Sequence, residues 1–354
     1  GDDGADGAAG AQGIQGIQGP AGDDGADGAA GAQGIQGIQG PAGVAGNDGA
    51  DAPLPSGTTT GFGDSHLNSI TTGTHNTVYG FHSLSLATTS SHNTAYGLGS
   101  GRYITSGVDY GVFFGENTGR SVTGDYITAI GSSAMQNGGG NYCVGIGYQS
   151  MLNVTATCYS STCVGSLSGK SLTGGLNTFI GYKAAETATS GSNNLCCGQL
   201  AGTSSSPFNV STNSNSIVLG NNSITDAYCK VAWTITSDER MKTNIQDFSF
   251  NSLDYINALQ AKEYNMNNPQ DYIDNNIEND GSLMEPNKSI GFIAQNVKLI
   301  EDQLLPNDIV VNSKNLDNLG VRYTALIPIL VDAMKKQQVM IDDLLNRIQL
   351  LENV

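Results

Sequence analysis

The stretch WTITSDERMKTNI, from Trp233 to Ile245, places a serine five residues ahead of a lysine. A lysine can act as the general base for a serine hydroxyl, in place of the histidine of other hydrolases. It does so only where desolvation or a neighbouring charge lowers the lysine pKa from about 10.4 towards neutrality. Ser237 and Lys242 are therefore candidates for acyl-transfer chemistry at this point of the chain.

The spacing of Ser237 and Lys242 constrains the local structure. Residues i and i+5 lie about 140° apart on a helix and on opposite faces of a strand. A turn must therefore intervene between the two side chains, or the pair must come from different chains. A structural alternative needs no chemistry: Ser237 could cap the N-terminus of a helix, with Glu239 and Arg240 in its first turn and Lys242 on a solvated face.

From Ser237 onwards the composition changes, because glycine becomes rare and charged residues increase. Four segments follow one another here: SDERMKTNI at 237–245, IGFIAQNV at 290–297, GVRYTALIPILVDAMKKQ at 320–337 and the terminal LLNRIQLLE. Together they resemble the C-terminal intramolecular chaperone family, the peptidase S74 type. This family is found on phage tail spikes, tail fibres and fibre proteins of large DNA viruses. The resemblance covers residues 237–354.

The resemblance implies self-cleavage. The family cuts the peptide bond just before the serine with a Ser/Lys dyad, after which the chaperone leaves the assembled fibre. Carried over to this chain, the nucleophile is Ser237, the base is Lys242 and the scissile bond is Thr236–Ser237. The remaining motif positions are Asp238, Arg240, Asn244 and Ile245. No cofactor is expected. We hypothesise that the dyad becomes competent only after three chains have folded together, because earlier cleavage would discard the chaperone before the fibre had formed.

The last part of the chain carries an apolar seam with the spacing of a coiled coil. Its members are separated alternately by four and three residues and, with Gln337 as the one polar exception, are Leu330, Met334, Gln337, Ile341, Leu344, Ile348 and Leu351. The seam predicts a coiled coil over about 326–352, with Pro328 in the first helical turn, where proline is tolerated. Such a helix would gather chains before slower β pairing begins. A single helix packed on its own domain is the alternative.

Between Gly61 and Ser223 one short pattern recurs, as in NTVYGFHSL, DYITAIGSSA and NTFIGYKAA. Its anchor glycines are Gly63, Gly80, Gly97, Gly115, Gly131, Gly147, Gly165, Gly181, Gly198 and Gly220. The period of 16 to 18 residues, with a final interval of 22, predicts a solenoid of short strands, each followed by a glycine and a polar turn. We expect stability from stacking on neighbouring units and on two other chains. The pattern resembles the β-roll heads of trimeric adhesins and viral fibres.

The repeat region offers little for catalysis. Its carboxylates fall in different units, without the pair that glycoside hydrolysis requires; they are Asp64, Asp109, Glu116, Asp125, Glu186 and Asp226. Its histidines lack a typical ligand spacing, so no metal is expected; they are His66, His75, His82 and His92. Aromatic residues are expected in the core or between chains, with exposed ones suited to stacking on sugar rings; examples are Tyr79, Phe81, Tyr96, Tyr148 and Tyr182.

All six cysteines lie between Cys143 and Cys229, in the middle section of the chain, and their spacings match no zinc pattern. Most are expected to be small buried hydrophobes, with disulfides as the alternative. The adjacent Cys196 and Cys197 should point to opposite faces if their segment is a strand.

Glycine at every third position from Gly1 to Gly49 predicts a collagen-like stalk over 1–51, wound from three chains and joined to the head by a linker at 52–60. The net charge of −17 divides into −8 over 1–51, −1 over 57–236 and −8 over 237–354. Without a basic patch, nucleic acid is not expected as a partner. No apolar run approaches the roughly 18 residues of a spanning helix, so membrane insertion is not expected.

Together these features predict a multi-domain homotrimeric fibre. A collagen-like triple helix precedes an all-β solenoid head over 61–236, and an α+β chaperone domain over 237–354 ends in the coiled coil. The predicted protein is an extracellular viral surface or tail fibre subunit of the virion, which attaches to a host-cell glycan or protein receptor. Two alternatives stay open: a cellular trimeric adhesin or structural coat protein that retains its C-terminal domain, and a glycan-degrading spike enzyme.

Overall fold

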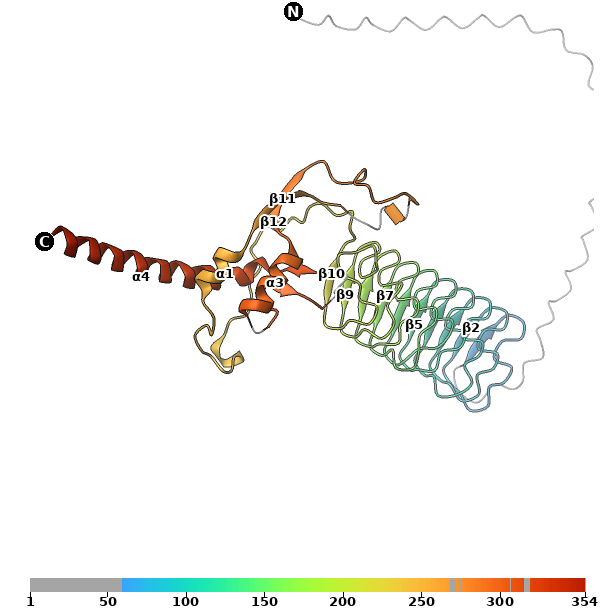
Figure 1. The fold of residues 1–354 in the computed structure, drawn as a ribbon. Helices are drawn as coiled ribbons and strands as arrows, with labels where there is room; N and C mark the ends of the chain where they lie inside the picture. The colour runs from blue at the N-terminus through green and yellow to red at the C-terminus, as the bar shows by residue number, and fades with distance from the viewer. Residues whose placement is uncertain (1–58, 268–271, 274, 306, 315–318, 354) are drawn as a thin grey trace, which may run out of the picture. The chain divides into compact units, whose positions relative to one another are not determined.

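A computed structural model describes residues 59–267, 272–273, 275–305, 307–314 and 319–353. The predicted collagen-like stalk at 1–51 and most of the linker lie outside the described residues. Along the described chain, a β-solenoid is followed by an α+β domain with a long final helix, which is the order predicted from the sequence (Figure 1).

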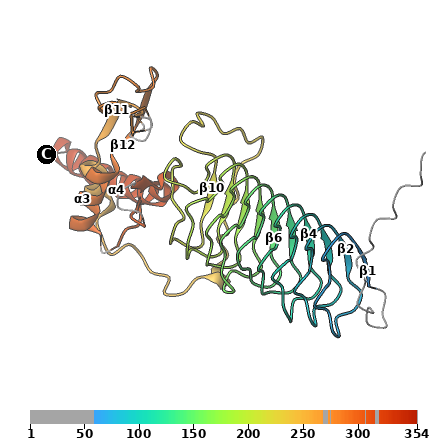
Figure 2. The ribbon, with the colours of Figure 1, turned by 90° about the vertical axis from the view of Figure 1, so that its right-hand side faces the viewer.

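The solenoid is built on one parallel sheet in which each strand pairs with the next along the chain (Figure 2). Its ten three-residue strands are β1 (Thr60–Phe62), β2 (Thr77–Tyr79), β3 (Thr94–Tyr96), β4 (Val112–Phe114), β5 (Thr128–Ile130), β6 (Val144–Ile146), β7 (Thr162–Val164), β8 (Thr178–Ile180), β9 (Leu195–Cys197) and β10 (Ile217–Leu219). Pairing is in register, so that Thr77 stands beside Thr94. Equivalent residues of successive units therefore form columns.

The middle residue of each strand points into the solenoid, and from β2 onwards it is buried. This column consists of Val78, Ala95, Phe113, Ala129, Gly145, Cys163, Phe179, Cys196 and Val218. The first and third strand residues point outwards, as the alternation of a strand requires. Each unit thus contributes one strand residue and several turn residues to a continuous core, so the repeat has no separate globular centre.

The anchor glycine directly follows each strand and is explained by two constraints. Gly97 has φ of +126°, a conformation that side chains with a Cβ rarely adopt. A Cβ placed on Gly97 would lie 2.5 Å from the carbonyl oxygen of Gly115 in the next turn. Only glycine lets the backbones of neighbouring turns approach this closely, which is why the sequence keeps it at every unit.

The asparagine of the NTVYG and NTAYG units has an equally specific place. Asn76 and Asn93 are buried on successive turns, and the backbone N–H and side-chain amide of Asn93 both donate to Oδ1 of Asn76, at 3.0 and 3.2 Å. Asn177 and Asn194 repeat the arrangement. These ladders satisfy backbone groups at the corner before the strand.

The cysteines behave largely as predicted. Four are buried in the solenoid: Cys143, Cys158, Cys163 and Cys196. In β9, Cys196 points inwards and Cys197 outwards. All six thiols are free. Burial raises the pKa of the Cys196 thiol to about 12, so this side chain acts as a small hydrophobe.

The C-terminal domain combines short helices with two small antiparallel sheets, β11 with β12 and β13 with β14. Its elements are η1 (Glu239–Met241), α1 (Ser252–Ala258), β11 (Ala261–Asn265), β12 (Lys288–Phe292), α3 (Ala294–Leu304), β13 (Val311–Asn312), β14 (Gly320–Val321), η2 (Tyr323–Ala325) and α4 (Leu326–Glu352). The core is small and consists of Tyr255, Val297, Leu305, Val310, Val311, Leu326 and Ile329.

A buried carboxylate organises the segment after α3. Glu301 is 1% exposed and accepts the backbone N–H groups of residues 309, 310 and 311 at 2.6 to 3.0 Å. Nη1 of Arg322 donates to the carbonyl oxygens of residues 308, 309 and 311 at 3.0 to 3.1 Å. The segment is therefore held from both sides, and the carboxylate is fully satisfied.

Helix α4 has two different faces. Leu326, Ile329 and Ala333 are buried in the domain, where α4 packs against α1. Across that contact the Ser252 hydroxyl donates to Oδ2 of Asp332 at 2.6 Å, and Nζ of Lys336 lies 2.8 Å from the same oxygen. The apolar seam residues predicted to form a coiled coil are exposed. Pairing with other chains therefore stays a prediction, while the alternative of packing on its own domain holds only for the first turns.

No helix in the described part of the chain is long and apolar enough to cross a membrane.

Candidate active site

The candidate dyad is placed by the turn η1. The carboxylate of Asp238 accepts the backbone N–H of Arg240 at 2.9 Å and forms an ion pair with Nη2 of the same residue at 2.6 Å. These contacts with Arg240 lower the pKa of Asp238, so the carboxylate stays charged. The backbone N–H of Lys242 donates to the Glu239 carbonyl at 2.9 Å, which closes the turn.

The turn brings the two side chains together within one chain. Nζ of Lys242 lies 2.8 Å from Oγ of Ser237, which is hydrogen-bonding distance. Of the two arrangements that the sequence allowed, this is the intervening turn. A lysine amine at this distance can accept the serine proton when it is neutral, which is the geometry that a Ser/Lys nucleophile requires.

The alternative in which Ser237 caps the N-terminus of a helix is wrong. Asp238, and not Ser237, caps η1, because its side chain receives the Arg240 N–H. The serine hydroxyl is left free of a capping role and faces Lys242. Two other motif residues, Asn244 and Ile245, follow the turn; Asn244 has φ of +55°, a left-handed conformation that asparagine tolerates well, and Ile245 is exposed.

The dyad is open to water in the single chain. Thr236, Ser237 and Lys242 are all exposed, and the whole segment 225–236 that leads to them is exposed as well. The two candidate side chains are therefore within hydrogen-bonding distance of each other but are not covered by other parts of the described chain.

Two columns of stacked aromatic rings run along the solenoid. On the outer face of the sheet, Tyr79 stacks on Tyr96 and Tyr96 on Phe114, each at 4.8 Å between ring centroids. The second column stands at the corner before the strands, at spacings of 4.7 to 5.0 Å, and consists of His75, His92, Tyr110, Tyr126 and Tyr142. Tyr79 and Tyr96 are exposed in the single chain, so of the two predicted places, the core and the contact between chains, the core is excluded for them. Because each ring covers its neighbour, a sugar could stack only at a column end.

Two carboxylates that the sequence placed in different units stand on neighbouring turns. Oδ1 of Asp109 accepts the backbone N–H of Ser91 at 2.6 Å, and Oδ1 of Asp125 accepts that of Asp109 at 2.8 Å. These contacts support a structural role at the corner. Among the described residues, no three histidine, cysteine or acidic side chains gather as a metal site would require.

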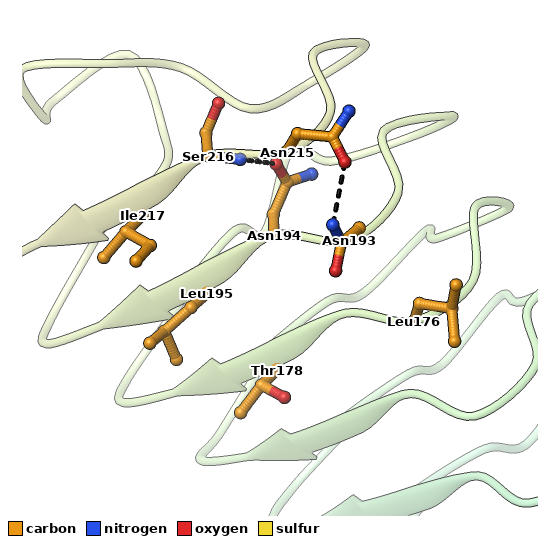
Figure 3. Close-up of a pocket in the computed structure, with 8 residues that line it drawn as sticks. All are labelled: Leu176, Thr178, Asn193, Asn194, Leu195, Asn215, Ser216 and Ile217. Atoms are coloured by element: carbon orange, nitrogen blue, oxygen red, sulfur yellow. Dashed lines mark hydrogen bonds between the residues drawn. The ribbon is translucent and has the colours of Figure 1, made fainter. Parts of the chain in front are cut away.

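A pocket of about 370 Å³, which was not predicted from the sequence, opens beside the last turns of the solenoid (Figure 3). It is lined by Leu176, Thr178, Asn193, Asn194, Leu195, Asn215, Ser216 and Ile217. Nδ2 of Asn193 donates to Oδ1 of Asn215 at 2.7 Å across its polar side (Figure 3). No titratable side chain lines the pocket, so it could hold a neutral ligand but offers no acid or base.

The two ends of the chain match the models of two different protein families. Residues 237–307 match the family model described as chaperone of endosialidase, and residues 1–55 match the model described as collagen triple helix repeat. The first match begins at Ser237, the serine of the dyad. No curated protein matches the chain. The two matches confirm the resemblances inferred from the sequence, and together they imply assembly as a homotrimer.

Proposed function

We propose that this chain, which carries collagen-like repeats and a chaperone-of-endosialidase domain, is a subunit of a homotrimeric viral surface or tail fibre. Its C-terminal domain drives trimerisation and then removes itself by cutting the Thr236–Ser237 bond. One observation carries the second statement: the 2.8 Å contact between Lys242 and Ser237, at the first residue of the matched domain.

The proposed reaction needs only these residues and water. The neutral amine of Lys242 takes the hydroxyl proton of Ser237, and Oγ attacks the carbonyl carbon of Thr236. As the new C–O bond forms, the C–N bond to Ser237 breaks, and the lysine returns the proton to the leaving nitrogen. Water then hydrolyses the Thr236 ester. The products are a chain that ends in a Thr236 carboxylate and a chain that begins with the free amine of Ser237.

Trimerisation would switch this reaction on. The dyad is exposed in the single chain, and Lys242 can serve as a base only in its neutral form. Partner chains that cover the turn would desolvate the amine and favour the neutral base. Cleavage should therefore follow assembly, and equal cleavage rates in monomer and trimer would contradict this step.

The outer face of the head supports a trimeric head. The third residue of every strand is apolar and points outwards; these residues are Phe62, Tyr79, Tyr96, Phe114, Ile130, Ile146, Val164, Ile180, Cys197 and Leu219. At about 4.8 Å between strands, the column is roughly 43 Å long. Monomeric proteins rarely expose an apolar surface of this extent. We infer that the sheets of three heads pack together along it.

Attachment to a host is the role that this architecture serves best. Three identical heads make weak receptor contacts additive through effective concentration. The uncharged pocket beside β8 to β10 is a candidate contact for a neutral glycan or for a protein receptor. A glycan and receptor array probed with the trimer and with its Leu176→Glu variant tests this: a signal that the variant retains in full would exclude the pocket.

The decisive experiment is the denatured intact mass of the purified protein. We expect two fragments, ending at Thr236 and starting at Ser237, and an intact chain for Ser237→Ala. Lys242→Arg keeps the positive charge but cannot give up a proton near neutral pH, so it should also stay whole. Lys230→Arg is the matched control on the exposed segment nearby and should be cut normally.

If the wild type stays whole although a trimer has formed, self-cleavage is excluded. The chain would then be a cellular trimeric adhesin or coat protein that keeps its C-terminal domain as a permanent trimerisation tag.

A further inference from the structure

The segment between β10 and η1, residues 225–236, is exposed along its whole length. Besides Tyr228, which is 95% exposed, its large apolar side chains are 71% exposed at Val231, 82% at Trp233 and 70% at Ile235. Within the described residues, its backbone makes no hydrogen bond to another backbone group. Three large apolar side chains side by side in water are unfavourable, so the segment points to a partner that the single chain does not supply.

The order of the residues shows what kind of structure the segment would adopt. Val231, Trp233 and Ile235 alternate with Ala232 and Thr234. On a strand, the three large apolar residues would share one face and the small or polar residues the other. Valine, isoleucine, threonine and tryptophan also favour strands. The pattern is that of a half-buried strand whose apolar face has no cover.

The partner is identified by what flanks the segment. Collagen-like repeats precede the head and the chaperone domain follows the segment, and both imply three chains. Three copies of 225–236 must therefore lie between the same two trimeric parts. From Val231 to Thr236 the segment carries no charge, so three copies can approach without repulsion.

We propose that residues 225–236 of three copies form a β-structured neck in which Val231, Trp233 and Ile235 face one another at the threefold axis. The neck lies directly ahead of Ser237 and brings the three candidate cleavage sites close together.

One consequence rests on the proposed function. Cleavage at Thr236–Ser237 would leave the whole neck on the released head and remove α4 with the chaperone. The neck would then hold the C-terminal end of the three heads together in place of the lost helix. Without it, the last strand of each head would end in exposed Ile217 and Leu219, with no trimeric element behind them.

Trp233 is the only tryptophan of the chain, so its fluorescence reports on the neck alone. In the full-length trimer of Ser237→Ala, which cannot be cut, we expect an emission maximum shifted to the blue of the unfolded chain and strongly reduced quenching by acrylamide. Emission and quenching equal to those of the unfolded chain would overturn the proposal.

Two neighbouring substitutions test which face is covered. Val231→Asp places a charge on the proposed axis and should restore quenching of Trp233. Ala232→Asp adds the same charge one residue later, on the opposite face, and should leave Trp233 protected. Equal quenching in the two variants would contradict the proposed arrangement.

Cys229 is exposed in the same segment. Cross-linking through Cys229 therefore shows whether Trp233 is covered by a partner chain or by the head of its own chain. A short bis-maleimide, which adds one thiol at each end, should join two chains through Cys229 in the trimer of Cys197→Ser, where the other exposed thiol is gone. Removing Cys229 as well should abolish these covalent dimers. Protection of Trp233 without any Cys229-dependent dimer would assign the cover to the same chain and reject the neck.

The neck and the cleavage fail in different ways. Cleavage of the wild type with Trp233 fully quenched contradicts only the neck. Protection of Trp233 in a chain that never cleaves contradicts only the proposed self-removal.

Discussion

The solenoid head and the C-terminal domain differ in where their stabilising contacts lie. In the head, each turn is bonded to the next at equivalent positions, as where the backbone N–H of Gly97 donates to Tyr79 and that of Gly115 to Tyr96, both at 2.8 Å. Its core runs through all the turns. In the described part of the C-terminal domain, the core cluster has seven buried residues, and the 27-residue helix α4 has an exposed seam.

The difference indicates which part depends on partner chains for its own structure. The head can satisfy its interior without them and leaves one outer column open. A helix as long as α4, with only its first turns packed, gains most of its stability from whatever covers its apolar seam. Helices also form faster than long-range β pairing. This contrast supports assembly that starts at the C-terminus and proceeds to the head.

The largest effect is expected from a charge in the seam of α4. Ile341→Asp should prevent trimerisation, since an aspartate would be buried at the helix interface without a partner. The chain should remain monomeric and uncut. Sedimentation and denatured intact mass measure both outcomes.

Asn346→Asp is the control for the seam. It introduces the same residue at a position that the heptad spacing places on the outer side of α4, and it should assemble normally. If Ile341→Asp still formed a cleaved trimer, the C-terminal domain would not need its seam, and the contrast between the two regions would be lost.

A charge on the outer column of the head should act later in assembly. Ile180→Asp puts three carboxylates into the proposed contact between heads, which should separate the heads without preventing C-terminal trimerisation. We expect a cleaved product in which the stalk and neck still join three chains, but whose separated heads make it sediment more slowly than the wild-type product. Thr187→Asp, exposed in a turn of the same unit, should leave the sedimentation of the product unchanged.

A cavity inside the head tests whether its stability is its own. Phe113 is completely buried, and its ring fills the space beside Gly111 and Gly119. Phe113→Ala should lower the free energy of unfolding of the head by about 3–5 kcal/mol. Denaturant unfolding of the released head measures this change, and self-cleavage should be unaffected. A loss of cleavage in this variant would show that head and chaperone do not fold independently.

Much of the fold was predictable because in-register parallel pairing repeats the same environment. Each anchor glycine meets the backbone of the next turn, so the glycine period located the strands. The Ser/Lys spacing likewise predicted a turn, and η1 supplies it. In both cases the constraint acts between residues at a fixed separation in the sequence.

Other features depend on contacts between turns of unequal length and were missed. Asp109 and Asp125 lie in different units, as predicted, but the hydrogen bond from the Asp109 backbone N–H to the Asp125 carboxylate was not predicted. Tyr79 and Tyr96 were predicted to pack in the core or between chains, and the repeat pattern did not show that their strand position points outwards. The pocket beside Asn193 and Asn215 lies in later turns than the ring column that runs from His75 to Tyr142. None of these has a signal within one unit.

The smallest expected effect is a difference in acid stability between the two regions. Hydrogen bonds from Lys336 and Ser252 lower the pKa of Asp332, the residue that joins α4 to α1. A carboxylate whose pKa is lower in the folded state than in the unfolded state stabilises the fold. This stabilisation is complete above the unfolded-state pKa of about 3.9 and is lost as the pH falls through the folded-state pKa. Asp332→Asn should therefore weaken the acid sensitivity of the C-terminal domain below about pH 4, while Asp343→Asn, on the exposed part of α4, should not. The circular dichroism signal of the helices, recorded as a function of pH, measures this acid transition. Because the helical signal comes from the C-terminal domain and not from the solenoid, an unchanged acid transition in Asp332→Asn would mean that the α1–α4 contact is held by its apolar residues alone.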